Sequence, residues 1–200
     1  MNKLTTILLV LLTAACAPVP QEEDWAPLPY HVYPKPDQQR SVVRDIQESV
    51  ADWNEKLRPS LGYDVFIFHE EGEPDPNACG TIVVGFGGIL NNKRCHEING
   101  EDCQATADLR DKCHLSVNLN ENGFWNTTIR HELGHTLGLP DISPEHATED
   151  GPNSIMVQGT LDHEILPSDV HNVVERINHR GGPRPPEEEG HSSCVVVTEE

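Results

Sequence analysis

The sequence predicts an α/β (α+β) fold, because helix-like and strand-like hydrophobic patterns are mixed along one chain of 200 residues. Over residues 38–57, apolar side chains recur at intervals of three and four, as on one face of an amphipathic helix, and Pro59 is expected to end this helix. The same spacing at 126–137, followed by Gly138, predicts a second helix with a left-handed stop. A third helix is predicted at 167–177.

Three short segments have the composition of strands. Residues 63–68 and 81–86 are rich in β-branched and aromatic side chains and are bounded by Gly, Pro or acidic residues. Residues 114–119 alternate between apolar and polar side chains, so we expect this strand to be half exposed. Residues 95–113 have no clear hydrophobic period, and no strand is predicted there.

Composition and charge limit the classes of function. Hydrophobic residues make up 36% of the chain and aromatic residues 5%, which permits one compact domain with a core of Leu, Ile and Val. The formal charge of −19, from 14 basic and 33 acidic residues, argues against sequence-independent binding to nucleic acid or anionic lipid, because both need clustered Lys and Arg. We therefore expect a monomer with no nucleic-acid partner.

The first residues have the pattern of an export signal. Lys3 precedes an apolar run that is too short to span a bilayer, and small residues follow up to Cys16. This pattern resembles a bacterial lipoprotein signal, in which residues 1–15 are removed and Cys16 carries the lipid. Cleavage after Ala17 is the alternative and would give a secreted protein. We expect export in either case, with a lipid anchor at Cys16 holding the protein on a membrane of the cell envelope, such as the outer membrane, or on the cell surface.

Composition also divides the chain into parts. The Pro-rich residues 16–37 are predicted to be an extended tether, residues 38–180 the domain, and residues 181–200 a flexible tail. Export permits disulfide bonds, but no spacing fixes the pairing and the odd number of cysteines leaves one unpaired. The cysteines after Cys16 are Cys79, Cys95, Cys103, Cys113 and Cys194.

Part of the second predicted helix carries a metal-binding pattern. Residues four apart lie one turn above each other, so His131 and His135 can direct two imidazole nitrogens at one point, with Glu132 beside it. A catalytic zinc ion takes three protein ligands and keeps a fourth position for water. Gly138 allows a sharp turn that would return Asp141 toward the metal as the third ligand. Glu132 would then be the general base for a zinc-activated water that attacks a carbonyl.

These residues, His-Glu-x-x-His-x-x-Gly-x-x-Asp, resemble the extended motif of the metzincin clan of zinc endopeptidases. Asp141 stands where most of the clan has His, a variation that is similar to the snapalysin-type proteases. His146, which lies off the spacing of the motif, is the competing third ligand. The resemblance implies that Met156 forms the clan's methionine turn beneath the metal. The alternative role for Met156 is that of a gap-filling core residue.

The resemblance also implies a metzincin-like zincin domain, with a small twisted mixed sheet, an antiparallel edge strand, an active-site helix and a C-terminal helix. In such a domain, residues 114–119 would form the upper edge of the cleft and pair with an extended substrate. The expected function is that of a zinc endopeptidase for extended peptides or proteins outside the cytoplasm. Two alternatives remain: a surface lipoprotein that binds a partner and has a non-catalytic zinc site, and a zinc amidohydrolase for a non-peptide substrate.

Overall fold

The computed structural model describes residues 26, 28–87, 105–109, 111, 113–120, 125–143, 153–157 and 163–180. The predicted signal peptide, the lipidation site Cys16 and the predicted tail at 181–200 lie outside these residues. Across the described ranges, no helix combines the length and the apolar character needed to cross a bilayer.

The described residues form a five-stranded mixed sheet and three helices, which confirms the predicted α/β class. The strand order is β2-β1-β3-β5-β4, in which the first four strands are parallel and β4 pairs antiparallel with β5 at one edge. In chain order, the elements are β1 (Tyr30–Pro34), α1 (Arg40–Leu61), β2 (Phe66–Phe68), β3 (Thr81–Phe86), β4 (Ala105–Asp108), β5 (His114–Leu119), α3 (Trp125–Thr136) and α4 (Pro167–Arg180).

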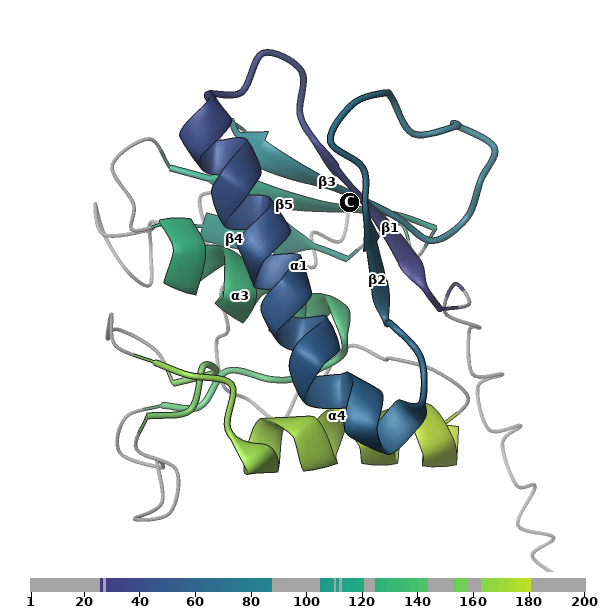
Figure 1. Cartoon of the computed structure of the whole chain (residues 1–200), viewed down its shortest axis with the longest axis vertical. Coiled ribbons are helices and arrows are strands. Elements are labelled where there is room, and N and C mark those ends of the chain that lie inside the picture. The colour runs from purple at the N-terminus through teal and green to yellow at the C-terminus, as the bar shows by residue number, and fades with distance from the viewer. Residues whose placement is uncertain are drawn as a thin grey trace, which may run out of the picture.

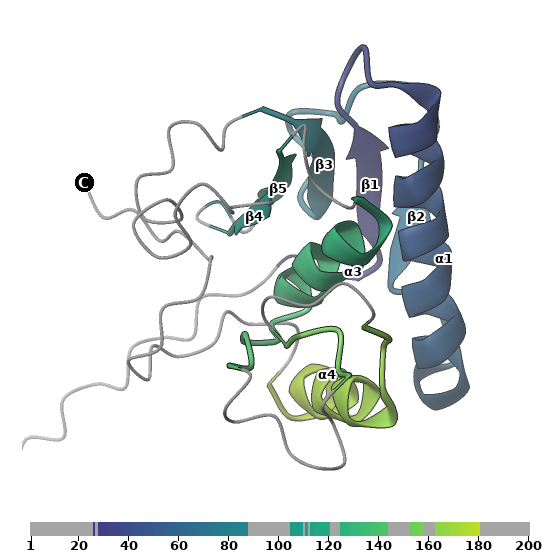
Figure 2. The ribbon, with the colours of Figure 1, turned by 90° about the vertical axis from the view of Figure 1, so that its left-hand side faces the viewer.

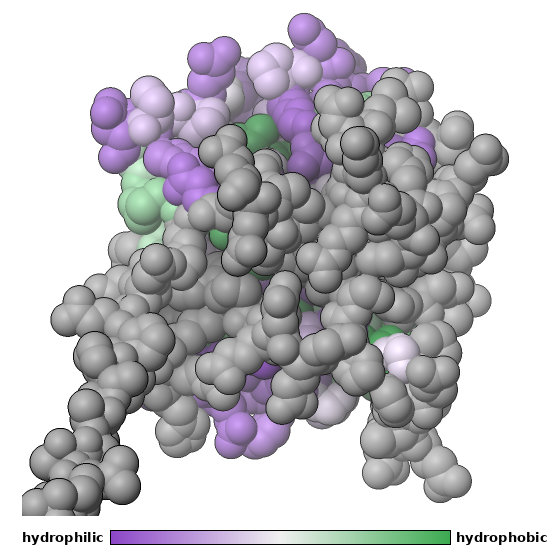
Figure 3. Space-filling view, turned by 180° about the vertical axis from the view of Figure 1, so that it is seen from behind, coloured by the Kyte–Doolittle hydropathy of each residue, from purple (hydrophilic) through white to green (hydrophobic). Residues whose placement is uncertain are grey.

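Helices α1 and α3 lie on the same side of the sheet (Figure 1). Helix α4 lies beyond α3, farther from the strands (Figure 2), and contacts α1. Seen from the side opposite α1, the described residues that reach the surface are mostly hydrophilic (Figure 3). The core therefore lies between the sheet and the helices, where the fully buried side chains include Trp53, Leu57, Ile82, Val84, Leu115, Val117, Ile129 and Leu133.

Strand β1 corrects the predicted tether. The prediction of an extended tether over 16–37 is wrong for Tyr30–Pro34, because this segment is an interior strand of the sheet, between β2 and β3. The side chains of Tyr30 and Val32 are fully buried on the helix side, as expected for alternate residues of a covered strand. The folded domain therefore begins before residue 38.

Helix α1 is longer than predicted. It continues through Pro59 to Leu61, whereas the sequence predicts an end before Pro59. Proline removes one backbone donor, and here it does so in the last turn, where few bonds follow. The helix ends instead at Gly62, whose φ of 81° places it in the left-handed region and whose N–H donates to Arg58 O at 2.8 Å.

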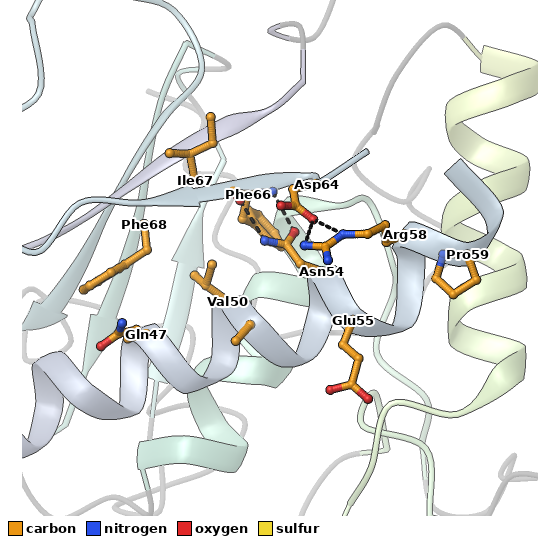
Figure 4. Close-up of a pocket in the computed structure, with 11 residues that line it drawn as sticks. Gln47, Val50, Asn54, Glu55, Arg58, Pro59, Asp64, Phe66, Ile67 and Phe68 are labelled. Carbon is orange, nitrogen blue, oxygen red and sulfur yellow. Dashed lines mark hydrogen bonds and ion pairs between the residues drawn. The ribbon is translucent and has the colours of Figure 1, made fainter. Parts of the chain in front are cut away.

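The outer edge of β2 is closed by a side chain of α1 (Figure 4). The Asn54 amide donates from Nδ2 to Phe66 O at 2.8 Å, and its Oδ1 accepts from the backbone N–H groups of Val65 and Phe66, both at 3.0 Å. Asn54 thus bonds the strand backbone as a neighbouring strand would, which limits further pairing at this edge.

The resemblance implies that residues 114–119 form the edge strand of the sheet. In the structure, the antiparallel edge strand is β4. Strand β5 (His114–Leu119) has the predicted bounds and the predicted alternation of buried side chains, but it lies between β3 and β4. Strand β4 comes from a stretch in which the sequence predicts no strand. A disulfide between Cys79 and Cys113 joins the segments that precede β3 and β5, so it ties the starts of two neighbouring parallel strands.

Candidate metal centre

Helix α3 presents two histidines at one point. It has nearly the predicted bounds, and its fully buried residues Ile129 and Leu133 fix it against the core. His131 and His135 are one turn apart on this helix, with ring planes at 89° and the two Nε2 atoms 3.1 Å apart. This distance is too short for two unshared lone pairs, so the two nitrogens need a proton or a cation between them.

Asp141 joins this pair after a sharp turn. Gly138, with a φ of 85°, takes the left-handed conformation that the sequence predicts, and its N–H donates to His135 O at 2.8 Å. Asp141 Oδ1 then lies 3.0 Å from His131 Nε2 and 3.3 Å from His135 Nε2, with the carboxylate only 7% exposed. The structure therefore brings the three predicted ligands together, with one ligand atom of each within 4.8 Å of the others.

Backbone carbonyls select the tautomers of both histidines. His131 Nδ1 lies 2.7 Å from Ile155 O, and His135 Nδ1 lies 2.8 Å from Leu139 O. A carbonyl oxygen only accepts, so each Nδ1 carries the proton, and each neutral ring keeps its lone pair on Nε2. Histidines that bind a metal through one nitrogen commonly donate the other N–H in this way. Two imidazole nitrogens and one carboxylate also match the donor set of a catalytic zinc site.

Electrostatic interactions within the cluster favour a proton on His135 when no metal is bound. Burial acts to lower the pKa of His135, but the charge of Asp141 and the hydrogen bond to it outweigh burial and raise this pKa to about 9. Burial acts to raise the pKa of Asp141, but the charge of His135 and hydrogen bonds from both histidines hold it well below its usual range. A metal ion must displace the proton on His135, because histidine binds metals in its neutral form.

Glu132 is buried beside the histidines with one carboxylate oxygen available. The Ala107 N–H of β4 donates to this carboxylate, whereas Glu132 Oε2 has no hydrogen-bond partner within the described ranges. Burial raises the pKa of Glu132, although electrostatic interactions with His135 and His131 oppose this effect. An unpartnered buried carboxylate oxygen next to a three-ligand cluster is suited to accept a proton.

Met156 packs against α3. It is 1% exposed, its carbonyl accepts from Ile142 N–H at 2.8 Å, and its sulfur is packed against Gly134 of α3. The competing ligand His146 and the lipidation site Cys16 lie outside the described residues, so the structure does not place them.

Two hollows of the described surface lie away from this cluster. A groove of about 730 Å³ runs between α1 and β2 (Figure 4), and a hollow of about 390 Å³ lies between α1 and α4. Neither is lined by a residue of the histidine cluster. The convergence of ligand atoms, and not the size of a cavity, therefore marks the candidate site.

Three main-chain groups of the site were not predicted: the carbonyls of Ile155 and Leu139 and the N–H of Ala107. Every residue carries such groups, so the sequence contains no signal for them.

No protein-family model matches this chain, and no curated protein matches it in sequence. The metzincin resemblance therefore depends on the residues of the motif and on Met156.

Proposed function

We propose that this protein is a metzincin-type zinc endopeptidase, which hydrolyses peptide bonds of extended peptides or proteins outside the cytoplasm. One observation carries the proposal. His131 and His135 are both held with a proton on Nδ1, so their Nε2 atoms and the Asp141 carboxylate face a single point, where a cation could replace the second proton of His135. Purely structural zinc sites are usually closed by four protein ligands, whereas the three ligands found among the described residues, next to the carboxylate of Glu132, favour catalysis.

Glu132 is the proposed general base. Bound zinc would polarise the substrate carbonyl and lower the pKa of its water ligand. The Ala107 N–H holds the Glu132 carboxylate in place, and Oε2, which has no partner in the described part of the chain, is free to take the proton from the attacking water. Glu132 can then return this proton to the nitrogen leaving group. Because burial raises the pKa of Glu132, its proton affinity is closer to that needed near neutral pH.

The position of β4 favours a peptide as the substrate. Since the Ala107 N–H reaches Glu132, the outer edge of this strand is turned toward the general base. An extended peptide can add to such an edge through main-chain hydrogen bonds, which would place its backbone beside the catalytic residues. Export and a lipid anchor at Cys16 remain part of the proposal on the basis of the sequence.

The test is digestion of a peptide library by the full-length chain, read by mass spectrometry, with Glu132→Gln as the matched variant. We expect cleavage by the wild-type protein, a loss of at least about 10²-fold in Glu132→Gln, and equal zinc content in both. Retained cleavage in Glu132→Gln would overturn the mechanism. Zinc binding without cleavage of any peptide would favour the alternatives, a non-catalytic zinc site or hydrolysis of a non-peptide amide.

A further inference from the structure

The orientation of His131 depends on a turn that is distant in sequence. The carbonyl that accepts from its Nδ1 belongs to Ile155, 24 residues later and outside α3. Residues 154–157 form this turn, and Ser154, Ile155 and Met156 are each about 1% exposed. A change in the position of the turn would rotate the Ile155 carbonyl and, with it, the imidazole of His131.

A buried carboxylate on α4 holds this turn. Asp169 Oδ1 accepts from Ser154 Oγ at 2.7 Å, and Ser154 Oγ in turn accepts from Met156 N–H at 3.1 Å. The N–H of Ile155 also donates to the Asp169 carboxylate. Asp169 therefore contacts the turn both through a side chain and through the residue whose carbonyl binds His131.

Helix capping explains the hydrogen bond made by one of the two oxygens of the Asp169 carboxylate. Asp169 lies in the first turn of α4, and its Oδ2 accepts from Leu166 N–H at 2.9 Å, as the third residue of a capping box does. The cap does not require the bond from Oδ1 to Ser154. It also does not require a carboxylate that is only 2% exposed, since caps act equally well at the surface.

We propose that Asp169 is a positioning residue of the metal centre. Through Ser154 and Ile155 it holds the turn at 154–157 so that the Ile155 carbonyl fixes the tautomer and the direction of the His131 imidazole. The carboxylate is thus linked to His131 by two hydrogen bonds through one residue, Ile155, whose N–H donates to Asp169 and whose carbonyl accepts from His131. This inference rests on the proposed zinc site.

The experiment compares zinc affinity in the full-length chain, measured by competition with a chelator, and the absorption spectrum of the Co²⁺-loaded protein. Ser154→Ala is the main variant because it removes the link through the Ser154 hydroxyl but leaves the Leu166 cap of α4 and the bond from the Ile155 N–H in place. Asp169→Asn tests the carboxylate directly. Ser49→Ala is the matched control, since Ser49 is a fully buried serine whose Oγ lies 2.7 Å from Asp45 O and 3.2 Å from Asn126 O in the first turn of α3, with no bond to the turn at 154–157.

We expect zinc affinity to fall by about 10–100-fold in Ser154→Ala and Asp169→Asn, with a changed Co²⁺ spectrum. Ser49→Ala should lower the thermal stability of the metal-free protein and leave the zinc affinity unchanged. Unchanged zinc affinity in both folded variants, Ser154→Ala and Asp169→Asn, or an equal loss in Ser49→Ala, would overturn the positioning role. A His131→Ala variant that binds zinc as tightly as the wild type would instead overturn the metal site itself.

Discussion

A methyl group on Gly134 would lie 2.5 Å from the sulfur of Met156, so the turn at 154–157 and the histidine helix are in contact at a position without a side chain. The same methyl group would lie 3.2 Å from Trp53 Cζ2. Gly134 lies between His131 and His135 on α3, and glycine is unfavourable inside a helix by about 1 kcal/mol. Close packing of Met156 against Gly134 therefore accounts for the glycine.

Gly134→Ala should destabilise the metal-free protein by about 1–2 kcal/mol, because overpacking in a filled core outweighs the gain in helix propensity. The loss should be smaller when Met156 is also replaced by alanine, since the new methyl group then occupies space that the thioether has left. Urea unfolding of the two single variants and the double variant measures this coupling, expected at about 1 kcal/mol or more. Additive effects, or a more stable Gly134→Ala protein, would contradict direct packing of the two residues.

Asp141 is the proposed third ligand, and its replacement tests this role. Asp141→Ala should lower zinc affinity by more than the roughly 10–100-fold loss that follows removal of an outer hydrogen-bond partner. Asp141→His is the matched variant, because histidine is also a zinc ligand and should retain part of the affinity. The measurement is the zinc content of the two variants after dialysis. Full zinc occupancy in Asp141→Ala would transfer the role to His146.

The sequence predicted the elements with strong local patterns and missed those that depend on distant pairing. The apolar stripe of α3 and the alternation of β5 are local signals, and both elements lie where they were predicted. Strand β4, with the sequence Ala-Thr-Ala-Asp, has little strand propensity, and its pairing with β5 determines it. The sequence places strand β1 in the tether because prolines alternate there with acidic and aromatic residues, although Pro34 ends the strand without disturbing its centre.

In the candidate site, too, the features with a local sequence pattern were predictable and those that depend on distant contacts were not. The spacing of the motif was sufficient to predict that His131, His135 and Asp141 converge, because helix geometry and a left-handed glycine determine it. The link from Asp169 to Ile155 joins α4 to a turn through backbone groups, and such contacts leave no mark on the sequence. Side-chain identities were therefore predictable here, whereas the groups that orient them were not.

The metal-free protein should lose stability in alkaline solution. The pKa of His135 is raised from 6.5 to about 9 in the folded state, so its stabilising charge is fully present below pH 6.5 and is lost as the pH rises toward 9. The pKa of Asp141 is lowered, so its contribution is lost only in acid, below its ordinary value of 3.8.

Urea unfolding in the presence of a chelator between pH 6 and 9 measures this decline, with Asp141→Asn as the control. The variant should lack most of the alkaline decline, since His135 no longer has its carboxylate partner. The pKa of Glu132 is raised mainly by burial, which acts in both proteins, so the larger part of its effect is common to the two. An equal decline in both proteins would show that the His135–Asp141 pair is not its cause.

We expect the stability of β2 to depend on the side chain of Asn54. Asn54→Ala leaves the N–H groups of Val65 and Phe66 and the carbonyl of Phe66 without their partner at a buried strand edge. Each unsatisfied buried group costs about 1–3 kcal/mol, and water can reach part of this edge from the open groove, so we expect a total loss of about 2–4 kcal/mol. Gln47→Ala is the matched control, since Gln47 lines the same groove but is exposed (Figure 4). Amide hydrogen exchange should accelerate at Val65 and Phe66 in Asn54→Ala alone, and equal protection in both variants would mean that pairing with β1 is sufficient to hold the strand.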